Sequence, residues 1–252
     1  MLKKITKKIY KELKKIQALG FLQYVKYNMT SKGILVKIKI KENHVVIRKG
    51  TPDLRVAISS LGGEFDIMKH LFDSDYDGFI IDAGGYIGTS AIALNKLFPN
   101  AKIIIVEPSL ANIEIMRKNL VAHPEIKIIY GALVGEPKDK IQLKNRLTGE
   151  WGFTVVPDPA DKPQAETMCE VPAFMIEDLV EKAEDIGILK LDIEGGEFEI
   201  LEKDAETLRR ISVIFAELHD RIVPGCYDRF VEFSKSRILI KDNGEKYLSI
   251  KK

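Results

Sequence analysis

The 252-residue sequence is poor in cysteine, histidine and tryptophan, and it lacks a long apolar run. Its two cysteines, Cys169 and Cys226, form neither a CxxC motif nor a zinc-like spacing, which argues against a disulfide framework and favours a reducing compartment. No stretch of 18 apolar residues could span a bilayer, and no apolar segment typical of a secretory signal follows the lysine-rich start. We therefore expect a cytoplasmic protein.

Charge is unevenly distributed, although the net charge is only +2. Residues 1–50 contain 14 Lys and Arg but two acidic residues, a net charge of +12. The remaining 202 residues contain 25 basic and 35 acidic residues, a net charge of −10. A basic N-terminal segment joined to an acidic remainder suggests either that the partner is an anionic surface or that the two parts attract each other within the molecule.

Residues 2–19 have the spacing of an amphipathic helix. Lysines fill many positions, and apolar residues recur at helical intervals at Ile5, Ile9, Leu13 and Ile16. Such a helix could make peripheral contact with an anionic membrane through residues 1–27. Because solvated charged faces are common, we favour the other interpretation, in which the apolar stripe packs on the domain.

The hydrophobic pattern predicts an α/β fold behind a short N-terminal extension. Apolar and polar residues alternate over 33–54, so residues 1–70 are expected to form a basic helix with antiparallel strands. Strand-like runs then alternate with helical patterns, and the expected strands are 79–85, 102–108, 126–135, 186–195 and 211–219. This order predicts a mostly parallel, Rossmann-like sheet with helices on both faces in residues 71–252.

An insertion at 136–176 interrupts the alternation. Two short apolar segments flank a turn at Leu147–Glu150, which predicts a hairpin that could form a lid or a substrate wall. Trp151 and Phe153 lie in this hairpin and could either stack on a sugar face or pack within it. A second hairpin, turning at Asn243-Gly244, is predicted near the C-terminus.

The segment IIDAGGYIGTSAIAL (80–94) reads as a strand, a glycine turn and a helix. Gly84 and Gly85 permit a tight turn close to a ligand, and Gly88 lets the helix approach the strand. The spacing does not fit GxGxxG, and Asp82 would be unfavourable beside a pyrophosphate. An acidic residue suits instead a cofactor that carries an ammonium and a sulfonium, which describes S-adenosylmethionine (SAM).

The next strand ends in Glu107, 25 residues after Asp82. A carboxylate at this place can accept both hydroxyls of an adenosine ribose. Pro108 and Ser109 follow, and Ser109 is suited to cap the next helix. Two strand-end acids in register with a strand–loop–helix unit predict a nucleoside-type cofactor.

These motifs resemble those of class I SAM-dependent methyltransferases and, more narrowly, those of the FkbM family. The resemblance rests on IIDAGGYIGTSAIAL, on IIIVEPSLANIEIMRKNL (103–120) and on the most specific block, ILKLDIEGGEFEIL (188–201). It spans about residues 45–220, and it departs from the usual Gly-Ala of the first loop at Gly84-Gly85. It implies a sheet with its first strand central, methylation of hydroxyl groups, often on sugars, and SAM contacts from Asp82, Gly84, Gly85, Gly88 and Glu107.

Four polar residues follow the last two apolar strands of the predicted sheet: Asp192, Glu194, Glu217 and His219. Methyl transfer requires an aligned acceptor oxygen, and a general base would add about 10²–10⁴-fold to the rate. His219 could be that base because a histidine pKa lies near neutrality, Asp192 could be the base, or the cluster could hold a divalent ion. No HxxH-like spacing supports a metal, so none is expected.

Glu197 and Glu199 belong to the start of the following helix, whose apolar stripe is Phe198, Leu201, Ala205 and Leu208. Negative side chains are favourable at a helix N-terminus. We interpret both as solvent-facing residues of that helix rather than as members of the polar cluster.

The sequence therefore predicts a SAM-dependent O-methyltransferase whose acceptor is a hydroxyl of a sugar, a glycan or a glycosylated small molecule. One alternative is a non-catalytic SAM-binding protein at a membrane surface, and another is a nucleotide-dependent oxidoreductase on the same fold. Nucleic acid is not expected as a partner, because no aromatic residues interleave the N-terminal lysines. The sequence leaves the acceptor and the oligomeric state open.

Overall fold

The strands expected from their apolar runs assemble into one seven-stranded sheet, in the order β12-β13-β11-β10-β3-β4-β5. This computed structural model describes the backbone of residues 2–73 and 75–252, and the side chains of these ranges apart from residues 2–8, 11 and 184. The strands are β3 (Phe79–Ala83), β4 (Lys102–Glu107), β5 (Lys127–Tyr130), β10 (Ile186–Leu191), β11 (Val213–Glu217), β12 (Ile238–Lys241) and β13 (Lys246–Ile250). Neighbours from β11 to β5 are parallel, and β13 is antiparallel to β11 and β12. The predicted Rossmann-like sheet is confirmed.

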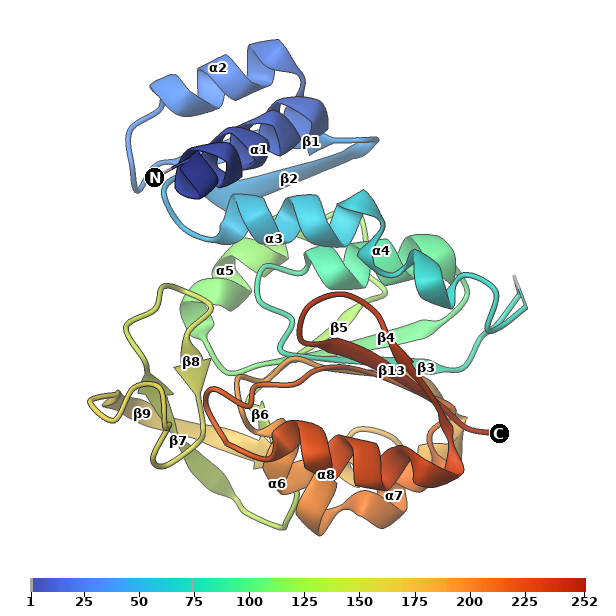
Figure 1. Cartoon of the computed structure of the whole chain (residues 1–252). Helices are drawn as coiled ribbons and strands as arrows, with labels where there is room; N and C mark the ends of the chain where they lie inside the picture. The colour runs from blue at the N-terminus through green and yellow to red at the C-terminus, as the bar shows by residue number, and fades with distance from the viewer. Residues whose placement is uncertain (1, 74) are drawn as a thin grey trace.

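Helices cover both faces of this sheet (Figure 1). One face carries α3 (Asp53–Ser59), α4 (Thr89–Leu97) and α5 (Leu110–Asn119), and the other carries α6 (Glu197–Lys203), α7 (Ala205–Arg210) and α8 (Cys226–Phe233). Successive strand residues point to opposite faces. Ile80 accordingly packs in one apolar cluster and Ile81 in the other, which explains the uninterrupted apolar runs.

Two elements differ from the sequence-based expectation. The strand expected over 126–135 divides at Gly131, whose φ is 156°. A Cβ there would lie 2.7 Å from the carbonyl oxygen of Pro172, so glycine lets the chain leave the main sheet for a second one. The helix expected from the stripe Phe198–Leu208 is also divided, because α6 ends before Asp204 and α7 begins after it.

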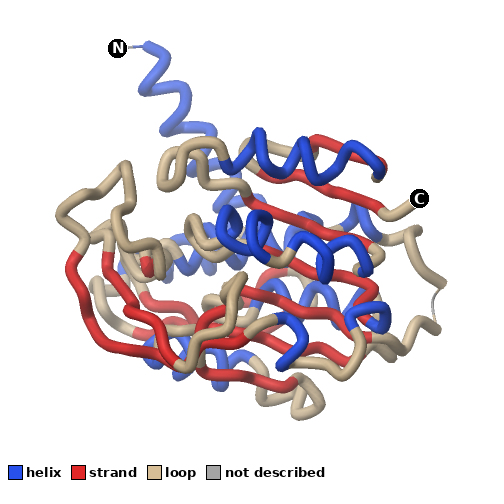
Figure 2. Tube along the Cα trace, turned by 90° about the horizontal axis from the view of Figure 1, so that it is seen from below, coloured by secondary structure: helices blue, strands red, loops and turns tan. Residues whose placement is uncertain are grey.

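The second sheet is formed largely by the insertion, in the order β6-β9-β7-β8. Its strands are β6 (Ala132–Leu133), β7 (Lys140–Asn145), β8 (Phe153–Thr154) and β9 (Glu166–Phe174). The predicted hairpin is confirmed, since Lys144 pairs with Thr154 and Asn145 with Phe153. The long strand β9, which contains Pro172, was not predicted. Seen from below, this sheet lies at one end of the main sheet (Figure 2).

The N-terminal extension packs on the face of the main sheet that carries α3, α4 and α5. It consists of α1 (Leu2–Leu19), α2 (Phe21–Met29), β1 (Leu35–Ile40) and β2 (Asn43–Arg48), the two strands being antiparallel as predicted. Ile38 and Ile47 belong to the same apolar cluster as Ile80. The side chain of Asn119 on α5 accepts from the backbone nitrogen of Val46 at 2.6 Å and donates to its oxygen at 3.2 Å. The predicted domain boundary at residue 70 stays a prediction, but one apolar cluster contains residues from both sides of it.

The helix predicted at the N-terminus is confirmed, but the predicted packing of its apolar stripe is wrong in part. Ile9 and Leu13 are 54% and 57% exposed, and Leu19 at the end of the helix is the only buried residue among its described side chains. The side chain of Ile5 lies outside the described residues. Among the described residues, no helix combines the length and apolar composition that crossing a membrane requires.

Candidate active site

A cleft opens at the carboxyl ends of the central parallel strands. Parallel α/β sheets bind ligands at this edge because the loops after the strands diverge there. The cleft brings together three groups of predicted residues: Gly84, Gly85, Glu107 and Pro108; Asp192, Glu194 and Glu217; and Trp151 and Phe153. Asp82, Gly88, Ser109 and His219 are buried behind this lining or beside it.

The glycine loop after β3 is tight because it packs against two neighbouring elements. Gly84 has φ 79°, and a Cβ on it would lie 1.8 Å from the carbonyl oxygen of Asp192. A Cβ on Gly85 would lie 2.0 Å from the side chain of Ile105. Side chains at these positions would therefore separate β3 from β4 or from the turn after β10. The predicted tight turn is confirmed, and it sets Asp192 directly against the loop.

Asp82 is fully buried and does not face the cleft. Its Oδ1 lies 2.9 Å from Nζ of Lys190, and the hydroxyl of Ser90 donates to its Oδ2. Lys190 and Ser90 are the residues of this group that line the cleft. The ammonium also lies 3.0 Å from the oxygen of Gly84 and 3.8 Å from Asp192. Asp82 therefore holds Lys190 beside the glycine loop. The predicted direct contact of Asp82 with SAM stays a prediction.

Lys190 is a buried cation inside an otherwise apolar strand. Burial lowers its pKa, but the charges of Asp82 and Asp192 outweigh that effect and raise it above the usual lysine value. The ammonium thus stays charged and links the glycine loop to the acidic turn. A lone lysine within ILKLD was the available sequence signal for this role.

Glu107 ends β4 inside the cleft with its oxygens partly occupied. Its Oε2 accepts from the backbone nitrogen of Tyr86 at 2.9 Å, and its Oε1 accepts from the backbone nitrogen of Ser109 at 3.0 Å and from Asn112 at 3.1 Å. Burial raises the pKa of this carboxyl, these donors oppose the rise, and the result is a pKa of about 7.

The residues at this edge fit the nucleoside part of SAM. A carboxylate has about four acceptor positions, and three donors already use the two oxygens of Glu107. One position on Oε2 remains, which suits one ribose hydroxyl rather than the two expected. Ser109 caps α5 as predicted, because its side chain accepts from the backbone nitrogen of Asn112.

A buried network ties this edge to the N-terminal extension. Arg48 at the end of β2 donates to both oxygens of Asp53 at 2.9 Å and to the side-chain oxygen of Asn112 at 2.9 Å. Tyr86, in the glycine loop, donates its hydroxyl to Asp53 at 2.5 Å. Residues of β2 and α3 therefore position Asn112 and Tyr86, which donate hydrogen bonds to Glu107. No sequence motif indicated this network.

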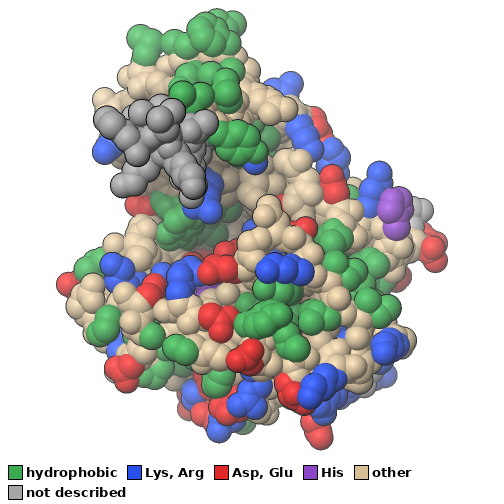
Figure 3. Space-filling view, in the orientation of Figure 1, with side chains coloured by type: hydrophobic (Ala, Val, Ile, Leu, Met, Phe, Trp, Pro, Cys, Tyr) green, Lys and Arg blue, Asp and Glu red, His purple; other side chains and the backbone are tan. Residues whose placement is uncertain are grey.

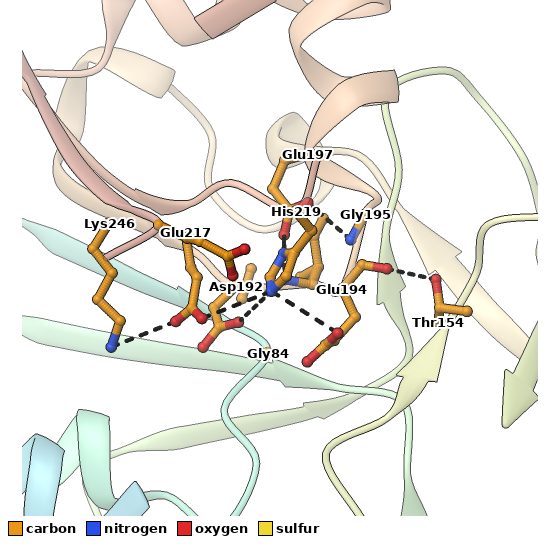
Figure 4. A network of polar contacts seen from close by, with 12 residues as sticks. Gly84, Thr154, Asp192, Glu194, Gly195, Glu197, Glu217, His219 and Lys246 are labelled. Atoms are coloured by element: carbon orange, nitrogen blue, oxygen red, sulfur yellow. Dashed lines mark hydrogen bonds and ion pairs between the residues drawn. The ribbon is translucent and has the colours of Figure 1, made fainter. Parts of the chain in front are cut away.

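The acidic turn after β10 surrounds one buried histidine (Figure 4). Nε2 of His219 lies 3.8 Å from Asp192 and 3.9 Å from both Glu194 and Glu217, and it has no hydrogen-bond partner among the described residues. Nδ1 lies 3.0 Å from Glu197. The four predicted residues Asp192, Glu194, Glu217 and His219 are thus brought together.

The carboxylates around His219 favour its protonated form. Burial lowers its pKa, but the charge and hydrogen bond of Glu197, with the charges of Glu194 and Asp192, outweigh burial and raise the pKa to about 10. An imidazolium has no free lone pair to take a proton. His219 as a general base stays a prediction, and the charges around it favour the protonated imidazole.

Glu197 is a correction to the sequence analysis, because it is fully buried rather than solvent-facing. Its two oxygens accept from the backbone nitrogens of Ile193 at 2.7 Å and Gly195 at 2.9 Å, as well as contacting His219. It therefore closes the turn and orients the imidazole. Glu199 remains partly exposed and pairs with Lys138 on the other side of the helix.

Two of the other acidic residues in the cluster form ion pairs with basic side chains. Glu194 adopts φ 53°, a strained conformation for a non-glycine residue, and its carboxylate contacts Arg146 and, at 3.5 Å, Arg221. Glu217 lies 3.4 Å from Lys246. Burial raises the pKa of both carboxyls, in Glu217 together with the charge of Asp192. Asp192 alone among the three has only contacts of 3.8 Å, to Lys190 and His219.

Two groups of described residues have ligand atoms close enough to hold a divalent ion: Asp192, Glu194 and His219, and Glu217, His219 and Glu245. An ion in either group would have to displace the proton on His219. In the first group it would also compete with Arg146 for Glu194.

The two aromatic residues of the insertion reach the cleft and also pack locally. Trp151 packs against the main apolar cluster, donates its indole nitrogen to the oxygen of Thr148 at 2.9 Å, and has the guanidinium of Arg55 5.1 Å from its ring. Phe153 packs against the apolar residues of the small sheet. Both line the cleft, so the stacking and packing roles considered for them are compatible.

Comparison with known proteins agrees with the motifs of the cleft. A family model described as the methyltransferase FkbM domain matches residues 82–247. Among solved structures, the chain is similar to an rRNA methylase from Streptococcus thermophilus, with 11% identity, 75% of this chain and 93% of that chain covered, and a TM-score of 0.43. It is also similar to a precorrin-6y C5,15-methyltransferase from Geobacter metallireducens GS-15, with 13% identity, coverages of 74% and 87%, and a TM-score of 0.41. No curated protein matches its sequence.

Proposed function

The chain belongs to the FkbM methyltransferase family, and from that premise we propose that it transfers a methyl group from SAM to a hydroxyl oxygen of a sugar, a glycan or a glycosylated small molecule. Membership in this family makes SAM the cofactor and sets aside the oxidoreductase alternative. When bound, SAM supplies an electrophilic methyl group on a sulfonium sulfur. The acceptor oxygen has to lose a proton to react with it.

The position of Asp192 carries this proposal. Its backbone oxygen lies against the glycine loop at Gly84, and its carboxylate opens into the same cleft as Glu107. Its side chain is 32% exposed and is free of the short contacts that engage Glu194. A carboxylate so placed can accept the hydroxyl proton next to the methyl-donor edge. We assign it the role of general base.

The other members of the cluster support that role. The imidazolium of His219 is held by Glu197 on one side and faces Asp192 on the other. A fixed cation at this distance holds the carboxylates in place without needing to exchange its own proton. His219, Glu194 and Glu217 are therefore positioning residues, which orient Asp192 and the acceptor.

The aromatic lining supports a sugar as acceptor. Trp151 and Phe153 line the cleft together with the turn that contains Asp192. Aromatic faces pack well on the apolar face of a sugar ring, while carboxylates and arginines accept and donate to its hydroxyls. Arg55 and Glu64, which also line the cleft, add to that polar surface.

The test is transfer of isotope-labelled methyl from SAM to a panel of neutral sugars, nucleotide sugars, lipid-linked glycans and amine-bearing analogues. We expect a labelled product whose methyl group is attached to oxygen. Transfer to nitrogen or carbon would contradict the hydroxyl acceptor. Tight SAM binding without turnover on any of these acceptors would support the non-catalytic alternative.

A further inference from the structure

Large apolar side chains are exposed mainly in the N-terminal extension. Among the described side chains, 17 large hydrophobic residues are exposed, and nine of these lie between residues 9 and 35. They are Ile9, Tyr10, Leu13, Phe21, Leu22, Val25, Met29, Ile34 and Leu35. Single exposed apolar residues are ordinary, but a concentration in about a tenth of the chain marks an interaction surface. Figure 3 shows hydrophobic side chains gathered over α2, at the end of the molecule away from the small helices α6 and α7.

The exposed residues of α2 form one continuous face. Phe21, Leu22, Val25 and Met29 recur at helical intervals and are 67%, 84%, 36% and 81% exposed. The opposite face is buried through Tyr27, which is 6% exposed. This apolar face of α2 is therefore a regular feature of the helix.

The orientation of α2 is fixed by hydrogen bonds to its neighbours. The side chain of Gln23 donates to the oxygen of Leu19 at 2.7 Å and accepts from the backbone nitrogen of Lys39 at 2.8 Å. Tyr24 packs against the main apolar cluster and donates its hydroxyl to Glu12 at 2.9 Å. The apolar face of α2 cannot rotate inward without breaking these contacts, so folding holds it in water.

The charge of the surrounding sequence selects the kind of partner. Residues 1–50 carry a net charge of +12, and Lys14 and Lys26 on the two helices are exposed. A second copy would bring two such segments together and repel. Nucleic acid would attract the lysines, but it would not bury the apolar side chains of Leu22, Val25 and Met29. An anionic lipid surface matches both features, because apolar side chains enter the acyl boundary while lysines contact the headgroups.

We propose that the apolar face of α2, with the adjoining exposed residues of α1, docks the protein on the surface of a bilayer that contains anionic lipid. Leu22, Val25 and Met29 enter the interface, and exposed lysines of the two helices, such as Lys14 and Lys26, contact the headgroups. The contact is peripheral, and it is independent of the methyl-transfer chemistry proposed for the cleft.

The test is co-sedimentation of the full chain with vesicles of phosphatidylcholine alone and of phosphatidylcholine with about 30 mol% phosphatidylserine, in 50 mM and 500 mM salt. We expect at least tenfold tighter binding to the anionic vesicles at low salt, with most of it lost at high salt because charges are screened. The double variant Leu22→Ser with Met29→Ser is expected to bind at least tenfold more weakly. The matched control replaces two exposed apolar residues elsewhere, Val121→Ser with Met168→Ser, and is expected to bind like the wild type.

Three results would overturn the proposal. The first is absence of binding to anionic vesicles at low salt, and the second is equal binding by wild type and the Leu22/Met29 variant. The third is a concentration-dependent dimer, seen by sedimentation equilibrium, that the same variant abolishes, because it would assign this face to a second copy. Unchanged SAM binding by both variants, measured calorimetrically, checks that each is folded.

Discussion

Replacing Glu197 by Gln should destabilise the protein far more than replacing its neighbour Glu199 by Gln. Both residues begin α6, yet Glu197 is fully buried against the imidazolium of His219 and two backbone donors, whereas Glu199 is partly exposed. Removing one partner of a buried ion pair costs about 3–5 kcal/mol, whereas a largely solvated pair contributes about 0.2–1 kcal/mol. We therefore expect Glu197→Gln to lower the free energy of unfolding by roughly 3 kcal/mol and the melting temperature by about 6–12 °C.

Urea denaturation followed by the fluorescence of Trp151, the single tryptophan, measures both variants. The pH dependence supplies a second signature. The pKa of His219 is raised to about 10, so its contribution to stability is complete below the ordinary histidine pKa of about 6.5 and is lost as pH rises towards 10. In Glu197→Gln, the loss of stability as pH rises towards 10 should be much smaller. If Glu197→Gln and Glu199→Gln differ by less than about 1 kcal/mol, the buried ion pair does not stabilise the turn as inferred.

Four further results are expected. Asp192→Asn should lower kcat by about 10²–10⁴-fold while changing the Kd of SAM less than threefold, measured by turnover and calorimetry; an unchanged kcat would remove Asp192 as the base. Glu107→Gln should weaken SAM binding by about 10–100-fold, the loss of a hydrogen bond to a charged group, whereas the exposed Glu114→Gln on α5 should not. Because the pKa of Glu107 is about 7, wild-type affinity for SAM should rise as pH increases through 7, and a flat profile in calorimetry would contradict this. Prolonged EDTA treatment should leave turnover intact; loss of activity that Mg²⁺ or Mn²⁺ restores would favour an ion at one of the two groups that include His219.

The glycine loop and the strand ends could be predicted from the sequence because local rules determine them. Gly84 and Gly85 are required by a turn whose neighbours leave no room for a Cβ, and apolar runs identify strands buried on both faces. The carboxyl ends of parallel strands meet at one edge of the sheet. The convergence of Asp192 with Glu217 and His219 at the end of β11 followed from that rule, although Asp192 and His219 lie just beyond their strands.

Other features of the site depend on residues far apart in the sequence. The burial of Glu197 depends on His219, 22 residues later, and the position of Glu107 depends on Asn112 and, through it, on Arg48 of β2. No local pattern indicates which carboxylate of GGEFE turns inward, because both Glu197 and Glu199 suit a helix N-terminus.

The sequence by itself determined the fold and the edge of the sheet at which the cofactor site is expected, since periodicity, glycine placement and strand order are read locally, and its motifs indicated the family. Only the tertiary structure decided which charges are buried and how they are paired, because burial and pKa depend on neighbours that several segments contribute. The same holds for the apolar face of α2. Its residues are ordinary for an amphipathic helix, and only the packing of Tyr27 and Gln23 shows that this face points to solvent.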